Sequence, residues 1–196
     1  MITSKKLYNL YLIADKKALN ISSNSITDKL KNSLFPSPNW KFQKLLRKLE
    51  YHNNCKNKGV YKIYYIYLKY KYRNLSQKLG FSIPINVFGP GLSIVHYGTI
   101  VVNSAAKVGK NCRIHVCTNI GASGGSSKAP QIGDNVYIAP GAKIYGDITI
   151  ANNTAIGANA VVNKSFIEEN MMIAGNPAKA IKKIDINRVI QYIDTN

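Results

Sequence analysis

The sequence predicts a mainly β protein: a parallel β-helix preceded by an α-helical segment and followed by a short C-terminal helix. Two observations lead to this prediction. Apolar residues in positions 1–80 recur three and four apart, which is the spacing of one face of a helix. From about residue 83 they recur every six residues, which is the period of a solenoid built from short strands and corners.

The stretch SPNWKFQKLLRKLEYH carries the start signals of a helix. Ser37 suits the N-cap and Pro38 suits the first helical position. One apolar face of this helix is formed by Phe42, Leu45, Leu46 and Leu49. A second helix is expected to end at Gly80, with an apolar face of Tyr64, Leu68, Tyr72, Leu75 and Leu79.

The six-residue repeat defines the larger part of the chain. Its aliphatic positions are Val102, Val108, Ile114, Ile120, Ile132, Ile138, Ile144, Ile150, Ile156 and Val162. Three rungs close a coil, so each of these residues should point inward and stack on its equivalent one coil away. We therefore divide the chain into a basic helical segment (1–82), a β-helix domain (83–184) and a C-terminal helix or tail (185–196).

Positive charge is concentrated in the helical segment. Residues 1–82 hold 17 Lys and Arg against 3 Asp and Glu, whereas residues 83–196 hold 10 against 6. Such an excess favours an acidic glycan or peripheral contact with the anionic inner face of a membrane. An alternative of equal weight is that these helices cap the open end of the solenoid and bury its apolar rung. Nucleic acid is not expected as a partner, because no recognised binding motif accompanies the charge. No apolar run is long enough for a membrane span and no signal peptide is evident, so a cytoplasmic location is expected.

Neither the cysteines nor the histidines predict a metal site. Cys55, Cys112 and Cys117 lack framework or zinc spacing, so we expect reduced and mostly buried thiols. Two histidines without nearby carboxylates make a poor metal site.

The repeat is interrupted in three places, and a solenoid is expected to carry its function where its repeat breaks. The first break follows His96, because Ile94 and Val102 are eight residues apart instead of six. The second is IGASGGSSKAPQI (residues 120–132), where the glycine- and serine-rich loop GASGGSSKAP (residues 121–130) replaces a rung. The third is the exit MMIAGNPAKAIKKI. Twenty residues separate Ile94 from Ile114, which equals three rungs plus two inserted residues. Ile114 should therefore stack on Ile94, and His96 and His115 should lie on neighbouring coils near the same edge. Imidazole is well suited to accept a proton from a hydroxyl near neutral pH.

Residues 83–183 resemble the serine acetyltransferase-like branch of the hexapeptide-repeat acyltransferases. The motifs that carry the resemblance are GPGLSIVHYGTIVVN, NIGASGG, IAPGAKIYGDI, IGANAVV and AGNPAKAI. The resemblance implies a left-handed coil, acetyl-CoA as co-substrate, and a homotrimer with active sites between neighbouring chains. It implies that His96 is the catalytic general base, and we assign His115 a secondary role beside it. The positions expected to contact acetyl-CoA are Gly121, Ala122, Ser123, Lys128, Ala139, Pro140, Ala158 and Lys179.

Two departures from that branch bear on the acceptor. Val95 stands where serine acetyltransferases carry an acid before the catalytic histidine, and Lys128-Ala129 stands where they carry an Arg-His pair. No Asp or Glu occurs between residues 51 and 133, so Asn86, Ser82 or a neighbouring subunit would have to orient His96. The stretch RIHVCTNIGASGG is similar to capsule and colanic-acid O-acetyltransferases. We therefore expect transfer of acetyl to a sugar hydroxyl of a surface polysaccharide or its precursor.

Two alternatives remain open at this point. The first is a serine O-acetyltransferase that makes O-acetylserine. The second is a non-catalytic solenoid that acts as a binding or assembly protein.

Overall fold

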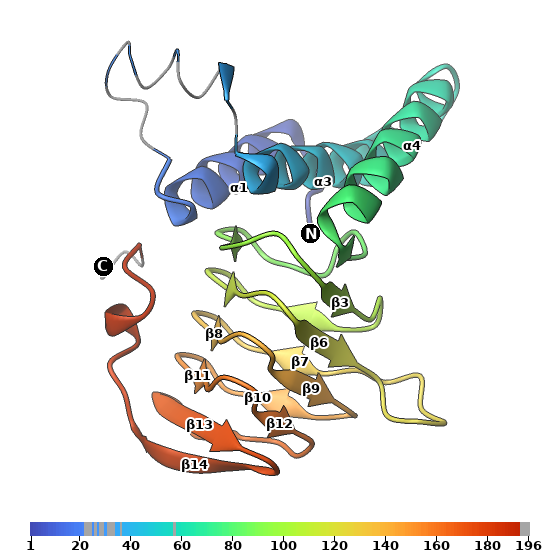
Figure 1. Ribbon diagram of the computed structural model, residues 1–196. Coiled ribbons are helices and arrows are strands. Elements are labelled where there is room, and N and C mark those ends of the chain that lie inside the picture. The colour runs from blue at the N-terminus through green and yellow to red at the C-terminus, as the bar shows by residue number, and fades with distance from the viewer. Residues whose placement is uncertain are drawn as a thin grey trace.

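A layer of helices lies across one end of a solenoid of short strands (Figure 1). The computed structural model describes residues 1–21, 25, 27, 30, 34–35, 37–56 and 58–192. The long helices are α1 (Lys5–Ala18), α3 (Pro38–Cys55) and α4 (Tyr61–Leu79). The strands are β1 (Phe81–Ser82), β2 (Ser93–Ile94), β3 (Ile100–Val102), β4 (Lys107–Val108), β5 (Arg113–Ile114), β6 (Thr118–Gly121), β7 (Gln131–Ile132), β8 (Tyr137–Ile138), β9 (Lys143–Tyr145), β10 (Thr149–Ile150), β11 (Ala155–Ile156), β12 (Val161–Val162), β13 (Met171–Gly175) and β14 (Ala178–Lys183).

The strands form the three sides of the solenoid. Sheet A has the order β1-β3-β6-β9-β12, sheet B the order β10-β7-β4, and sheet C the order β14-β13-β11-β8-β5-β2. Each coil runs from sheet C to sheet A to sheet B, and every pairing is parallel except β13 with β14. The parallel β-helix that the six-residue period predicts is therefore confirmed.

The inward residues stack in register along each side. On sheet C, Ile94 pairs with Ile114, Ile114 with Ile138, and Ile138 with Ile156, and all four side chains are fully buried. Every one of the ten predicted repeat positions lies in the core. Burial of each such side chain stabilises the fold by about 1.5–3 kcal/mol.

Asparagines make the corners between sheets B and C possible. Asn111, Asn135 and Asn153 have φ values of 57°, 55° and 55°, in the left-handed region that asparagine tolerates better than most residues. Their side chains also form a ladder, in which Nδ2 of Asn111 donates to Oδ1 of Asn135 (2.9 Å) and Nδ2 of Asn135 to Oδ1 of Asn153 (2.8 Å). The same residue type therefore sets the bend and links successive coils.

The two predicted helices are present as α3 and α4. Ser37 occupies the N-cap of α3 with Pro38 in the first turn, but the Ser37 side chain makes no capping hydrogen bond. Gly80 ends α4 in the left-handed conformation with φ of 76°. Phe42 and Leu46 of α3 join the solenoid core, so this face of the helix closes the open end of the coil.

A buried arginine joins two helices to the first coil. The fully buried Arg47 of α3 donates from Nε to Oδ2 of Asp15 on α1 (2.8 Å) and from Nη1 to Oε2 of Glu50 (3.0 Å). It also donates to the carbonyl oxygens of Phe88 (2.9 Å) and Gly89 (2.6 Å) in the solenoid. The two carboxylates raise the pKa of Arg47 against the opposing effect of burial, so the guanidinium stays charged.

Side chains of α3 also replace the missing neighbour of β2, the edge strand of sheet C. Gln43 donates from Nε2 to the carbonyl of Leu92 (2.7 Å) and accepts at Oε1 from the N–H of Ile94 (3.1 Å). Asn39 donates from Nδ2 to the carbonyls of Ile94 (2.9 Å) and Val95 (3.0 Å). The backbone polar groups of this edge are thus satisfied without another strand.

Two predicted boundaries need correction. The solenoid begins at β1, because Phe81 and Ser82 pair with Ile100 and Val101, so its start precedes residue 83. In the C-terminal segment (185–196), the expected helix is a single 3₁₀ turn, Ile186–Arg188, and residues 193–196 lie outside the described residues. Asp185 caps this turn by accepting at its side chain from the N–H of Asn187, and the β-branched Val189 and Ile190 that follow have low helix propensity.

The cysteines only partly follow the prediction. All three are free thiols, but only Cys112 is buried, while Cys55 and Cys117 are exposed. Cys117 is exposed because it lies at a corner between sheets C and A, with φ of 62°, instead of at an inward position. None of the helices in the described part of the chain combines the length and apolar character needed to cross a bilayer.

We predict that Asp15→Ala lowers the free energy of unfolding by about 3–5 kcal/mol, because it leaves the buried Arg47 charge without a main partner. It also removes the acceptor of the N–H groups of Gly91 and Leu92. Urea denaturation measures the change. The matched control is Asp147→Ala, which breaks an exposed ion pair with Lys128 and should leave the midpoint nearly unchanged. Equal effects of the two variants would contradict the structural role of the buried network.

Candidate active site

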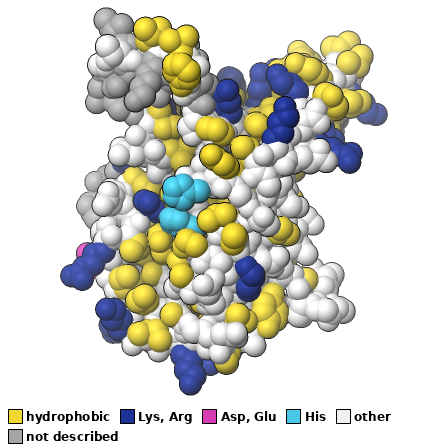
Figure 2. Space-filling model, viewed as in Figure 1, with side chains coloured by type: hydrophobic (Ala, Val, Ile, Leu, Met, Phe, Trp, Pro, Cys, Tyr) yellow, Lys and Arg dark blue, Asp and Glu magenta, His cyan; other side chains and the backbone are white. Residues whose placement is uncertain are grey.

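Two histidines lie side by side on the outer surface of the first coils. Ile94 and Ile114 are in register, and the rings of His96 and His115 follow them with centroids 6.2 Å apart. Figure 2 shows two adjacent histidine side chains on one face of the molecule. His96 is exposed, whereas His115 is buried. The predicted juxtaposition of the two histidines is confirmed.

Gly98 holds the loop that carries His96 in place through contacts with α4 and with the next coil. Gly98 donates its N–H to the carbonyl of Leu79 in the last turn of α4 (2.9 Å). Gly98 also has φ of 137°, and a Cβ at this position would lie 2.4 Å from Cγ2 of Val116 on the next coil. Only glycine fits this turn, so the two residues inserted after Ile94 form a fixed loop between α4 and the solenoid.

His115 is kept in its neutral form. Its ring packs edge-on against Tyr137, with centroids 5.2 Å apart. Burial, and secondarily the charges of Arg113 and His96, lower the pKa of His115 to about 4. Its Nε2 is buried without a hydrogen-bond partner among the described residues. A neutral imidazole with one unpaired ring nitrogen can exchange a hydrogen bond with a bound molecule or with a neighbouring group.

Arg113 is a candidate functional residue that the sequence argument missed. It pairs with Ser93 one coil away and lies beside His115, and its Nε is buried without a hydrogen-bond partner in the described chain. A small polar pocket adjoins it, lined by Lys17, Ala18, Leu19, Asn20, Ser93, Val95, Arg113, Gln191 and Tyr192. The sequence did contain a signal for this position. Arg113 is twenty residues after Ser93, the same interval that separates Ile94 from Ile114, so the repeat places Arg113 beside Ser93 on the next coil.

One group of predicted acetyl-CoA positions lies on the same side as the histidines. Ala139, Pro140 and Ala158 occupy the corners between sheets C and A on the next two coils. Lys179 lies on β14 opposite Ala174 of β13, further along sheet C. These residues follow the two histidines down one edge of the solenoid.

The other predicted acetyl-CoA positions lie elsewhere in the chain. Gly121, Ala122, Ser123 and Lys128 belong to the loop that leaves β6 at its far end and protrudes from the solenoid (Figure 1). A strand of four residues puts about 10 Å between its two ends. Within one chain, therefore, His96 lies near the N-terminal ends of the sheet A strands, and the glycine- and serine-rich loop lies at their C-terminal ends. Lys128 is also engaged, because its Nζ lies 2.6 Å from Oδ2 of Asp147.

No carboxylate orients the His96 ring within the described residues, and its imidazole has no hydrogen-bond partner there. Asn86, one of the groups considered for this role, instead accepts from Asn54 and donates its N–H to Glu50. The described part of the chain also holds no group of three His, Cys, Asp or Glu side chains that could bind a metal ion. The chemistry of the site therefore centres on imidazole and guanidinium groups.

Comparisons with known proteins identify a repeat family and several similar proteins. Residues 129–164 match the family model described as bacterial transferase hexapeptide (six repeats). The chain carries a bacterial transferase hexapeptide repeat. It is 35% identical over 128 residues to serine acetyltransferase of Staphylococcus xylosus, covering 60% of this chain and 59% of that protein. It is 36% identical over 100 residues to serine acetyltransferase of Mycobacterium tuberculosis, covering 50% of this chain and 43% of that protein.

Solved structures show the same fold. Serine acetyltransferase of Neisseria gonorrhoeae superposes with a TM-score of 0.70 at 23% identity, over 98% of this chain and 73% of that chain. The complex of serine acetyltransferase from Brucella abortus with coenzyme A gives a TM-score of 0.69 at 25% identity, over 92% of this chain and 70% of that chain. The chain therefore shares with these structures an architecture of helices followed by a parallel β-helix. The chain spans about half the length of the curated relatives that it matches.

We predict that His115 titrates near pH 4 in the folded protein, and that Arg113→Gln raises its pKa by removing a neighbouring positive charge. Because the pKa of His115 is lower in the folded state than the ordinary value of about 6.5, its contribution destabilises the fold as pH falls from about 6.5 towards 4. Histidine-selective NMR titration measures both effects, with His52 as an internal reference. A His115 resonance that titrates above pH 6 would contradict the buried, neutral ring.

Proposed function

We propose that the protein is an acetyl-CoA-dependent O-acetyltransferase in which His96 is the general base. The observation that carries the proposal is the exposed His96 ring on a fixed loop, beside the buried and neutral His115. The hexapeptide-repeat match and the similarity to serine acetyltransferases support this reaction class. A reaction that consumes acetyl-CoA also fits a cytoplasmic location.

In the proposed reaction, Nε2 or Nδ1 of His96 takes the proton of the acceptor hydroxyl. The hydroxyl oxygen attacks the thioester carbonyl of acetyl-CoA, and the carbon–sulfur bond breaks as the tetrahedral intermediate collapses. The proton passes to the departing thiolate, which gives free coenzyme A and an O-acetyl ester. Such a positioned base contributes roughly 10²–10⁴-fold to the rate. His115 would hold the acceptor or the neighbouring His96 by its unpaired ring nitrogen.

The arrangement of the cofactor positions favours an active site shared between copies of the chain. Ala139, Pro140, Ala158 and Lys179 lie along the edge that carries His96, whereas the loop 121–130 leaves the far end of sheet A. A neighbouring solenoid would bring its own loop to the His96 edge and complete a groove for coenzyme A. Backbone N–H groups of that loop would stabilise the developing oxyanion. A homotrimer satisfies this requirement by closed symmetry.

For the acceptor, the comparisons favour L-serine, the alternative in the sequence argument, over the expected polysaccharide. The relatives described above are named serine acetyltransferases, and nothing in them supports a polysaccharide acceptor. Arg113 supports a serine acceptor, because its Nε has no hydrogen-bond partner among the described residues and a guanidinium beside a polar pocket is suited to bind a carboxylate.

A sugar hydroxyl is the second candidate, for one specific reason. Serine carries an ammonium group, and no Asp or Glu occurs between residues 51 and 133 to bind it. Val95 lines the pocket directly before His96 and offers only an apolar side chain. An acceptor without an ammonium group would need no acidic partner.

We predict that His96→Ala lowers kcat by about 10²–10⁴-fold, because the attacking hydroxyl loses its base. Release of free thiol from acetyl-CoA measures turnover, and calorimetry measures coenzyme A binding, which should persist. His52→Gln is the matched control, since it changes a histidine of α3 and should retain activity. Unchanged turnover in His96→Ala would refute the assignment of the base.

We predict that L-serine is acetylated and that Arg113→Gln raises its KM by about 10–100-fold, the usual cost of a lost hydrogen bond to a charged group. L-serinamide, which lacks the carboxylate, should show the same high KM with both proteins. Turnover of sugars but not of serine would establish the second candidate. Absence of acetyl-CoA binding would favour a non-catalytic solenoid.

A further inference from the structure

We propose that the outward face of α4 binds the surface of an anionic lipid bilayer. The face is defined by Ile63, Ile66, Tyr67 and Tyr70, which follow the spacing i, i+3, i+4, i+7 of a single helical stripe. All four side chains are exposed, by 76%, 57%, 50% and 63% respectively. This proposal is independent of the acetyltransfer reaction.

The stripe is not part of the protein core. The opposite side of α4 packs on the solenoid and α3 through Leu68, Tyr72, Leu75 and Leu79. α4 therefore has two apolar faces, of which one is used in folding and the other faces outward. Figure 1 shows that α4 extends beyond the solenoid at its N-terminal end, so this part of the outward face has space for a partner.

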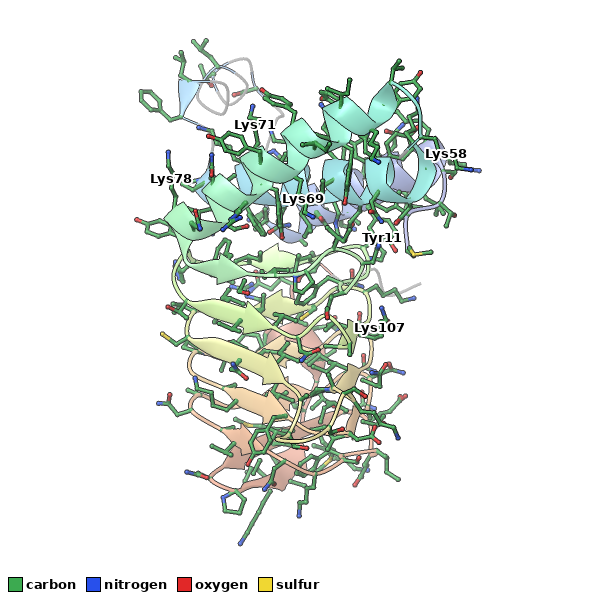
Figure 3. All side chains as sticks on the ribbon, turned by 90° about the vertical axis from the view of Figure 1, so that its right-hand side faces the viewer. Tyr11, Lys58, Lys69, Lys71, Lys78 and Lys107 are labelled. Carbon is green, nitrogen blue, oxygen red and sulfur yellow. The ribbon has the colours of Figure 1, made fainter. Side chains whose placement is uncertain are left out.

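Positive side chains flank the stripe on both sides. At 100° per residue, Lys62, Lys69 and Arg73 fall on one flank, and Lys71 and Lys78 fall on the other. Figure 3 shows Lys69 and Lys71 on opposite sides of α4. Within the described residues none of these five cations forms an ion pair with a carboxylate, and the chain has no Asp or Glu from 51 to 133.

The combination of residues matches the chemistry of a bilayer interface. Tyrosine rings place an apolar body and a polar hydroxyl at headgroup depth, and lysine stems extend along apolar surface towards lipid phosphates. Lys71 already lies over the ring of Tyr67, with Nζ 5.3 Å from the centroid. A groove beside the stripe brings together Leu45, Tyr67, Tyr70, Lys71, Asn74, Leu75 and Lys78, and so offers a headgroup both an apolar wall and two cations.

Charge and side-chain type favour lipid over the other possible occupants of this face. Two copies of α4 packed face to face would bring five cations of each helix together without a carboxylate between them. A nucleic acid would use the cations but would leave Ile63 and Ile66 against phosphates. An anionic bilayer suits both the cations and the apolar side chains of this face, because it accepts apolar side chains at its acyl boundary and cations at its surface.

Flotation with lipid vesicles tests the proposal on the full-length protein. Wild type should bind vesicles of mixed phosphatidylcholine and phosphatidylglycerol, and bind pure phosphatidylcholine much less. Each cation near an anionic surface changes partitioning by about fivefold, so Lys69→Gln with Lys71→Gln and Lys78→Gln should weaken binding on the order of 100-fold. Ile63→Ser with Ile66→Ser should weaken it too, and should do so at high salt, where charge attraction is screened.

The matched control removes the same charge from the solenoid, by Lys110→Gln with Lys164→Gln and Lys182→Gln. This triple variant should retain most of the binding, because its lysines lie away from α4. Circular dichroism and the unfolding midpoint confirm that each variant folds. Equal losses in the two triple variants would overturn the proposal by showing general charge attraction. Three other results would also overturn it: no binding by wild type, dissociation of an oligomer by the isoleucine variant without any vesicle effect, or preference of α4 for nucleic acid over vesicles.

Discussion

The buried Arg47 network is the interaction on which the arrangement of the whole chain depends. A solenoid end exposes an apolar rung and unpaired backbone groups, and α1 and α3 cover them only if they dock in one orientation. Arg47, with Asp15 and Glu50, fixes that orientation because each charged group has partners in more than one element. A buried ion triad gives less stability than its contacts suggest, since desolvation offsets much of the attraction. The hydrogen bonds of Arg47 require one placement of the helices on the first coil, whereas apolar contacts alone would tolerate sliding.

The docking of the helices on the first coil also determines where the candidate site lies. Asn39 and Gln43 of α3 form hydrogen bonds with the backbone along the free edge of β2. Val95 and His96 follow β2 directly in the chain. The last turn of α4 receives the hydrogen bond from Gly98 on the other side of the loop. The helical layer therefore determines where the imidazole stands, although no helical residue needs to touch a substrate. This gives the N-terminal segment a structural role whether or not it also contacts a membrane.

Local periodicity explains which parts were predictable. The six-residue repeat specified the inward ladders and, through the interval from Ile94 to Ile114, the meeting of His96 with His115. The interval from Ser93 relates Arg113 to the first coil, but the pocket beside this candidate residue also includes Tyr192, and no repeat relates Arg113 to that segment. The extent of the C-terminal helix was overestimated because the β-branched Val189 and Ile190 lower helix propensity directly after the capped turn. Repeats report contacts one coil away, whereas closures at the ends of a solenoid depend on unrelated sequences.

The two ends of the solenoid also determine how copies of the protein can meet. A parallel sheet with a bare edge is a template for further strands and hence for fibrous aggregation. At one end, α3 side chains occupy the edge of β2. At the other end of sheet C, the edge strand is β14, whose sequence AKAIKK places Lys179, Lys182 and Lys183 along an exposed border. Like charges on that border repel an approaching strand, so addition of a further strand to this edge of sheet C is disfavoured.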